Sequence, residues 1–138
     1  MASLDLDITT PESQVFKGTI DELIAPGAGG LFGVRPSHAP LLASLKPGIL
    51  SFTQAGASHH FALGGGFIEI ADDHVRVLAD TADRGEDIDL ERARAALADA
   101  TAKLDELVPG TSEYLYQQAR QVRAQQRIQL ATMLASSK

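Results

Sequence analysis

Residues 88–110 read IDLERARAALADATAKLDELVPG, and the composition of the chain changes at the start of this stretch. Short β-branched runs with glycine and proline precede it, whereas alanine, leucine and glutamine dominate after it. Within the stretch, apolar residues recur at steps of three and four, which is typical of one buried stripe on a helix. The members of this predicted stripe are Leu90, Ala93, Leu97, Ala100, Leu104 and Leu107.

A second helix is expected beyond Pro109-Gly110, because this pair cannot continue the first one. Asp89 is placed to cap the first helix, and Thr111 or Ser112 to cap the second. Two short helices bury little surface alone, so an antiparallel hairpin of this kind is marginally stable and able to open. The second helix has a weaker seam, formed by Leu115, Ala119, Val122, Gln126, Leu130 and Met133.

The part of the chain before this stretch predicts a β domain. Ser3–Thr9 alternates apolar and polar residues with period two, as in a strand that is buried on one face. Turns at Lys46-Pro47-Gly48 and Gly64-Gly65 separate further β-rich runs, at intervals typical of an antiparallel sandwich or barrel. The expected strands are 3–9, 15–25, 31–34, 41–45, 49–53, 59–63, 67–71 and 75–79, with a loop over 26–30.

Composition narrows the classes of function. A net charge of −6 argues against a nucleic-acid binder, and no apolar run approaches the ~20 residues of a membrane-spanning helix. The charge is unevenly distributed, because residues 112–138 contain one acidic residue, Glu113, against Arg120, Arg123, Arg127 and Lys138. This cationic segment is expected to meet its own acidic partner helix or an acidic surface elsewhere.

Neither a catalytic site nor a metal site is indicated. The chain has no cysteine and no Gly-x-Ser-x-Gly motif, which argues against covalent hydrolysis. His59 and His60 are adjacent on a predicted strand and point to opposite faces, so they do not converge on a metal. The glycine-rich segments 27–30 and 64–66 lack the lysine and helix of a phosphate loop, and strand turns or bulges explain them better.

Three arginines carry the clearest signal for a ligand. Arg120, Arg123 and Arg127 are spaced by three and four residues, hence on one face of the second helix. Folding of the hairpin brings Arg127 opposite the start of the first helix, near Asp89 and Arg92. Guanidinium groups are thereby gathered beside a helix N-terminus, whose amides and dipole also favour an anion.

Two interpretations of these arginines remain open. A phosphorylated ligand would satisfy the guanidinium groups and the helix amides together. Alternatively, the arginines form a solvated face with weak ion pairs. The ion-pair partners would then be Asp89, Glu91 and Asp99.

Three segments carry a family likeness: FGVRPSHAPLL at 32–42, GGFIEI at 65–70 and VLADTA at 77–82. They resemble motifs of the epsilon subunit of rotary, F-type ATP synthases, and the likeness follows essentially the whole chain in order. It implies an α+β fold with a ten-stranded or similar antiparallel β-sandwich over residues 1–87. A C-terminal antiparallel two-helix hairpin would follow over residues 88–138.

The resemblance also implies a non-catalytic central-stalk subunit of a proton-translocating synthase. Its partners would be the gamma subunit, the c-ring and the alpha and beta catalytic subunits. The protein would be peripheral on the cytoplasmic face of the bacterial inner membrane, without direct insertion. The implied rotor-docking loop contains Leu31, Arg35 and His38, although Leu31 stands where many relatives have an acidic residue.

In bacterial members of this family the hairpin can extend along gamma and block ATP hydrolysis. The catalytic head presents acidic segments near the rotor, so a cationic second helix suits the extended state. The inhibitory contacts implied for this chain come from Arg120, Arg123 and Arg127.

The family has a nucleotide-binding pattern, Ile/Leu-Asp-x-x-Arg-Ala, and this chain matches it in full. The matching residues are Ile88, Asp89, Arg92 and Ala93. The paired arginines of such members, four apart on the second helix, look like Arg123 and Arg127. The resemblance therefore implies ATP as a regulatory ligand, with no cofactor required.

Two positions depart from the ATP-binding pattern. Asp83 stands where ATP-binding relatives have glutamate, and Asp99 where some have arginine. Asp89 and Arg92 also have a purely structural interpretation, since they can cap and pin the hairpin. The leading prediction is a rotor subunit that couples the stalk to the head and regulates hydrolysis. The alternative is a free-standing nucleotide-sensing adaptor with the same fold.

Overall fold

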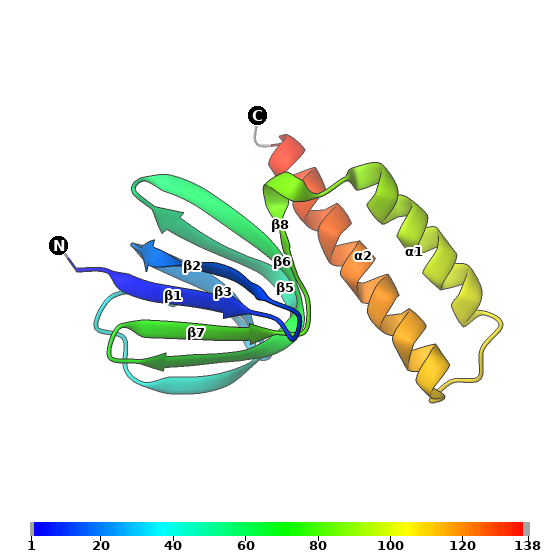
Figure 1. The fold of residues 1–138 in the computed structure, drawn as a ribbon, viewed down its shortest axis with the longest axis horizontal. Helices are drawn as coiled ribbons and strands as arrows, with labels where there is room; N and C mark the ends of the chain where they lie inside the picture. Colours follow the sequence, from blue (N-terminus) through cyan, green and yellow to red (C-terminus); the bar gives the residue numbers. More distant parts are fainter. Residues whose placement is uncertain (1, 137–138) are drawn as a thin grey trace.

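A computed structural model describes residues 2–136 (Figure 1). Its strands are β1 (Leu4–Thr9), β2 (Gln14–Ile20), β3 (Glu22–Gly27), β4 (Gly30–Val34), β5 (Leu41–Gln54), β6 (Ala57–Ala71), β7 (His74–Ala79) and β8 (Ala82–Arg84). The 3-10 turn η1 (Gly85–Asp87) leads to the helices α1 (Leu90–Leu104) and α2 (Ser112–Ser136). The predicted α+β fold of a sandwich and a helical hairpin is confirmed, while Lys138, predicted in the hairpin, lies outside the described residues.

The strands form one sheet that bends into two packed layers. Their order is β2-β1-β7-β6-β5-β3-β4, and β8 lies beside β6. The first part of β6 pairs with β8 and the last part with β7, so this strand belongs to both layers. Strand β5 follows β6 along its length and likewise passes from one layer to the other. The core between the layers is apolar and includes Leu6, Ile8, Phe52, Phe61 and Ile68.

Two of the predicted turns are wrong, because the chain continues through them as strand. Pro47 and Gly64 are partners in the β5–β6 ladder, at the points where turns were expected. The neighbouring Gly65 and Gly66 have φ angles of 109° and 142°, which only glycine adopts readily. The glycines therefore bend a long strand where it exchanges β8 for β7, and the chain does not reverse.

The strand predicted over 15–25 is two strands that break at Asp21. The reason is a change of partner, since β2 pairs with β1 whereas β3 pairs with β4 and β5. The loop predicted over 26–30 is shorter, because β3 extends to Gly27 and β4 begins at Gly30. The sheet is also not antiparallel throughout: β1 and β7 run parallel.

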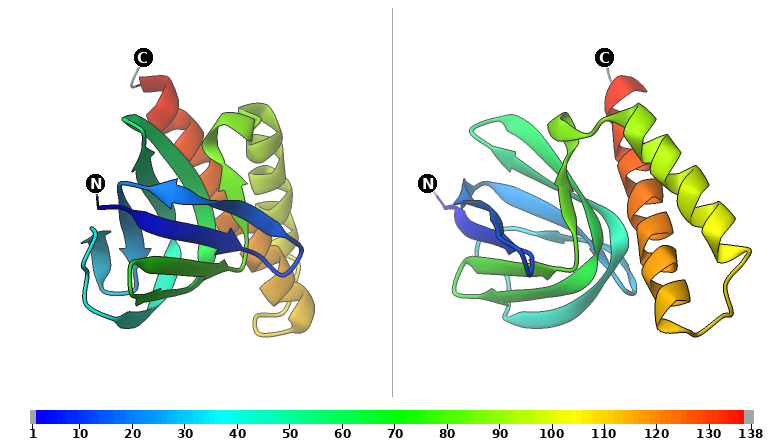
Figure 2. Two further views of the ribbon diagram at one scale, coloured as in Figure 1. Left: turned by 60° about the vertical axis from the view of Figure 1, so that its left-hand side comes forward. Right: turned by 45° about the vertical axis from the view of Figure 1, so that its right-hand side comes forward.

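Helix α2 lies between α1 and the sandwich, as both views in Figure 2 show. The predicted caps are confirmed: Asp89 Oδ1 accepts from the Arg92 N–H at 3.2 Å, and Thr111 Oγ1 from the Tyr114 N–H at 3.3 Å. In the predicted stripe of α1 the alanines are buried and the leucines are half-buried. That stripe is therefore confirmed in position.

The seam predicted for α2 is only partly correct. Leu130 is buried and Val122 and Gln126 are half-buried, whereas Leu115, Ala119 and Met133 are exposed. Gln117 and Ala124 are buried outside that seam. A helix with a neighbour on each side has to bury two faces, so its apolar residues do not follow a single stripe. The hairpin is thus held by the sandwich as well as by its own two helices.

The bend in β6 predicts a strict requirement for glycine. A methyl group at Gly66 would overlap the Leu78 carbonyl oxygen, and the φ angle of 142° adds backbone strain. We expect Gly66→Ala to lower the free energy of unfolding by at least about 2 kcal/mol, measured by urea denaturation. Gly56→Ala is the matched control, because Gly56 has a φ of 82° but open space around it, and should cost about 1 kcal/mol. Equal losses of unfolding free energy in the two variants would contradict the requirement for glycine at position 66.

Candidate functional site: a cleft between the sandwich and the hairpin

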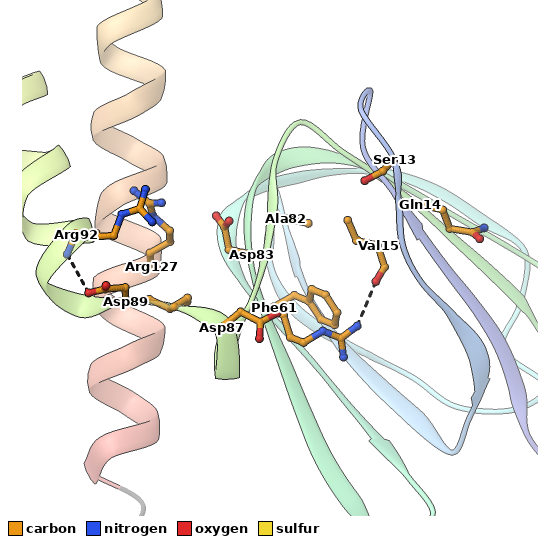
Figure 3. Close-up of a pocket in the computed structure, with 12 residues that line it drawn as sticks. Ser13, Gln14, Val15, Phe61, Ala82, Asp83, Asp87, Asp89, Arg92 and Arg127 are labelled. Carbon is orange, nitrogen blue, oxygen red and sulfur yellow. Dashed lines mark hydrogen bonds between the residues drawn. The ribbon is translucent and has the colours of Figure 1, made fainter.

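A cleft of about 450 Å³ opens where the hairpin meets the sandwich (Figure 3). The β1–β2 turn and the start of β2 contribute Ser13, Gln14 and Val15 to one side. Strand β8, η1 and the start of α1 form the base, and α2 closes the cleft with Arg127. Together with Phe61 of β6, residues from four distant parts of the sequence line one site.

The structure brings Arg92 and Arg127 together in this cleft, as the helix spacing predicted. Within residues 2–136 the Arg92 guanidinium makes no ion pair or hydrogen bond, and the buried Nε of Arg127 has no hydrogen-bond partner. Ile88 and Asp89 also line the cleft, whereas Ala93 is buried on the inner side of α1. Two cations with unused donors beside a helix N-terminus make this wall suitable for an anion.

A third arginine of the cleft is already engaged. Arg84 Nη2 donates to the Val15 carbonyl oxygen at 3.2 Å, and the guanidinium carbon lies 5.1 Å from the centre of the Phe61 ring. Its Nη1 is also 3.7 Å from Glu86 Oε1. These contacts fix Arg84 to the base of the cleft, where its charge adds to that of the helical wall.

Arg123 points to a different place. Its Nε donates to Asp83 Oδ2 at 3.0 Å and its Nη2 to Asp83 Oδ1 at 2.8 Å, which is a bidentate pair. These hydrogen bonds to the Asp83 carboxylate raise the pKa of Arg123 and keep it charged. Arg123 lines a smaller hollow beside the β1–β2 turn and not the main cleft. The pair ties α2 to β8, and the role of Arg123 as an ATP ligand stays a prediction.

The contact between the helices is largely polar. Arg120 Nη1 donates to Asp99 Oδ2 at 2.9 Å and to Gln117 Oε1 at 2.7 Å, and Gln121 donates to the Thr101 hydroxyl at 3.2 Å. Hydrogen bonds from Arg120 and Lys103 hold the pKa of the Asp99 carboxyl below its usual value. The fully buried side chains of α1 are the small ones of Ala93 and Ala100, whereas the leucines of its stripe are half-buried.

The ion-pair interpretation is thus correct for one of its three proposed partners. Asp99 pairs with Arg120 across the hairpin, whereas Glu91 pairs with Arg94 on its own helix. Asp89 acts as the cap of α1. The cationic face of α2 is therefore divided between the partner helix, the sandwich and the cleft.

The residues of the predicted rotor-docking loop lie at both ends of β4: Leu31 is near its start, beside the β3–β4 turn, whereas Arg35 and His38 follow its end. Leu31 is 70% exposed. Arg35 Nε donates to Glu22 Oε2 at 3.2 Å, and His38 Nδ1 lies 2.6 Å from the Ala39 carbonyl oxygen. Polar contacts therefore hold Arg35 and His38, whereas the apolar side chain of Leu31 is open to solvent.

Within residues 2–136, no three His, Cys, Asp or Glu side chains gather in a way that would hold a metal ion. In the same part of the chain, none of the helices combines the length and the apolar character needed to cross a bilayer.

The fold defines a class of protein in which a two-helix hairpin follows an N-terminal β-sandwich. Residues 3–85 match the family model described as the beta-sandwich domain of the ATP synthase Delta/Epsilon chain. The ATP synthase epsilon chain of Anaeromyxobacter sp. (strain Fw109-5) is 45% identical over 129 residues, which are 94% of this chain and 98% of that relative. The epsilon chain of Geobacter sp. (strain M21) is 44% identical over 128 residues, 93% of each chain.

The chain belongs to the ATP synthase epsilon chain family. Epsilon chains are accessory subunits of the synthase central stalk and not its catalytic subunits. The predicted family is confirmed, whereas the predicted boundary after residue 87 stays a prediction.

Solved structures show the same fold. A chain in the cryo-EM structure of the Euglena gracilis mitochondrial ATP synthase aligns with a TM-score of 0.75 at 22% identity, covering 96% of this chain and 82% of that chain. A chain in the central stalk and c-ring of the Tetrahymena thermophila mitochondrial ATP synthase aligns with a TM-score of 0.54 at 17% identity, covering 95% of each. The likeness at these identities concerns the fold.

Apart from Asp83, the sandwich side of the cleft was not predicted from the sequence. Arg84 and Phe61 lie in a region read only as β structure, and β8 is too short to produce a periodic pattern. Ser13 and Gln14 directly precede the strand predicted from residue 15, and nothing in their local pattern indicates that they lie beside the hairpin. Only the pairing of the strands brings these segments together.

The polar contact between the helices predicts a dependence on pH. Since the pKa of Asp99 is lowered by folding, its contribution is present above the ordinary value of 3.8 and is lost as the pH falls through the folded value. Asp99→Asn should therefore speed hydrogen exchange in α1 at neutral pH, and should differ less from the parent protein in acid. Glu91→Gln is the matched control, because Glu91 pairs within α1. A difference between Asp99→Asn and the parent that persists unchanged in acid would contradict this account.

Proposed function

We propose that this chain is a regulator carried by the rotor of a proton-translocating ATP synthase. The sandwich binds the gamma subunit and the c-ring, with Leu31, Arg35 and His38 in the docking loop. The hairpin moves between the position seen here and an extended one that reaches the alpha and beta subunits and inhibits ATP hydrolysis. In this role the protein is peripheral on the cytoplasmic face of the bacterial inner membrane and performs no catalysis of its own.

The character of the contacts that hold the hairpin supports this movement. Arg120–Asp99 and Arg123–Asp83 are partly exposed ion pairs, and the buried residues between the helices include Ala93, Ala100 and Gln117. Exposed pairs of this kind contribute up to about 1 kcal/mol each, and small side chains expose little apolar surface on separation. Water or an acidic partner can therefore replace these contacts at low cost.

The observation that favours a regulatory nucleotide is the buried, unpaired Nε of Arg127 beside the free guanidinium of Arg92. ATP phosphates in the cleft would accept from both arginines and from the α1 N-terminus. A ligand there touches α1, α2 and the sandwich at once, and these three parts meet only when the hairpin is folded. ATP would thus stabilise the folded hairpin by its differential affinity for that state.

Nucleotide binding can be tested by calorimetry with the isolated chain, with and without Mg²⁺. We expect Arg92→Ala combined with Arg127→Ala to weaken ATP binding at least about tenfold, because two charge-assisted contacts are lost. Arg94→Ala is the matched control, since Arg94 pairs with Glu91 away from the cleft. Unchanged affinity in the double variant would remove both arginines from the ATP site, and absence of binding by the parent chain would remove ATP from the proposal.

The Arg123–Asp83 pair provides a test of inhibition. In Asp83→Asn the carboxylate that holds α2 to β8 is lost, while Arg123 remains available for an acidic partner. We expect the assembled synthase to hydrolyse ATP about threefold more slowly, because the equilibrium shifts toward the extended hairpin. Glu86→Gln should leave the rate unchanged, since the ion pair of Glu86 is with Arg84. An equal or faster rate in Asp83→Asn would contradict the proposal that the Arg123–Asp83 pair holds the hairpin in its folded position.

The docking function is tested by co-purification. A synthase assembled from its own subunits should retain this chain together with gamma and the c-ring. A chain that never co-purifies with them would instead support the free-standing nucleotide-sensing adaptor.

A further inference from the structure

The segment after β4 contains a turn that does not suit its sequence. The His38 N–H donates to the Arg35 carbonyl oxygen at 3.2 Å, which closes a four-residue turn. Pro36 occupies its second position and Ser37, with a φ of 69°, its third. This is the pattern of a type II turn, in which the third position favours glycine. Serine is strained there, so the turn needs support from outside.

That support comes from a residue 36 positions further along the chain. Asp73 Oδ1 accepts a hydrogen bond from the Ser37 N–H at 2.6 Å, across to the tip of the β6–β7 hairpin. The Asp73 carbonyl oxygen accepts from the Asp5 N–H at 2.9 Å, which anchors the same residue to the start of β1. Asp73 thereby connects the turn around Ser37 to the start of β1.

We propose that Asp73 is a positioning residue for the docking loop. Its carboxylate holds the turn at Ser37 in the shape that presents Arg35 and His38 to the rotor. This inference rests on the proposed docking function of the loop. Without the carboxylate the serine leaves its strained conformation, and the loop has to be ordered when the partner binds, which weakens binding.

Two other contacts of the loop explain why Asp73 is the decisive one. Arg35 bonds to Glu22 on β3, and His38 bonds to Ala39 next to it in the chain. Neither contact involves the Ser37 N–H, and the turn-closing bond from the His38 N–H to the Arg35 carbonyl oxygen does not involve it either. Asp73 alone among the described residues bonds the amide of the strained residue itself.

The variants are chosen so that loss of the bond is separated from loss of the fold. Asp73 has a φ of 62°, so Asp73→Gly relieves backbone strain at the hairpin tip and removes only the carboxylate. Asp73→Asn retains an acceptor oxygen and tolerates the same φ. Ser37→Gly in the Asp73→Gly background removes the need for support. Asp72→Gly is the matched control, because Asp72 has a φ of 51° at the same tip and its carboxylate has no hydrogen bond within residues 2–136.

Two measurements are made on each variant: affinity for the gamma–c-ring complex of the same synthase, and hydrogen exchange at the Ser37 amide in the isolated chain. We expect Asp73→Gly to bind about fivefold more weakly and to exchange faster at Ser37, with an unchanged unfolding midpoint. Asp73→Asn should stay within about twofold of the parent, since an amide oxygen still accepts. Addition of Ser37→Gly should restore affinity, and Asp72→Gly should leave it unchanged.

Normal affinity in Asp73→Gly would overturn this proposal, as would a loss that Ser37→Gly fails to restore or that Asp72→Gly reproduces. If the parent chain itself failed to bind the gamma–c-ring complex, the proposed docking function would be overturned. The exchange rate at Ser37 distinguishes the two cases, because it reports on the Asp73 bond without any partner.

Discussion

The cleft and the hairpin both depend on one constraint, which is that α2 packs against two partners at once. On one side lies α1, and on the other lie β5, β6 and η1. Ala62 is buried although it alternates with the core residues Phe61 and Leu63, so its side chain lies on the outer face of the sheet that α2 covers. At Gly85 a side chain would collide with Leu134, which shows how closely α2 approaches η1. The cleft exists because this packing places Arg127 opposite the start of α1.

The contacts that α2 makes with α1 and with the sandwich are largely polar. A permanently buried helix pair would be expected to share a continuous apolar seam. Here the seam contains Gln117 and is flanked by the pairs of Arg120 with Asp99 and Arg123 with Asp83. A surface of this composition is tolerated both when it is covered and when it faces water. The proposed movement of the hairpin requires a surface with this property.

The sandwich has the opposite character. Its long strands β5 and β6 bind both layers into one unit, and the bend at Gly66 fixes the angle between them. Because the core is apolar and continuous, the loop at Ser37 and the sandwich side of the cleft are built on the same rigid body. The bond from Asp73 extends this rigidity to a turn that its own sequence would leave mobile.

The sequence alone determined the features that depend on neighbours within a few residues: the two helices, the caps at Asp89 and Thr111, and the meeting of Arg92 with Arg127. These follow from helical periodicity and from the single break between the helices. The tertiary structure decided which charges pair over long distances, such as Arg123 with Asp83, and whether glycines bend a strand or reverse the chain. It also decided which face of α2 is buried. Local patterns carry no information on these points, because each depends on which distant surface comes to lie against the residue.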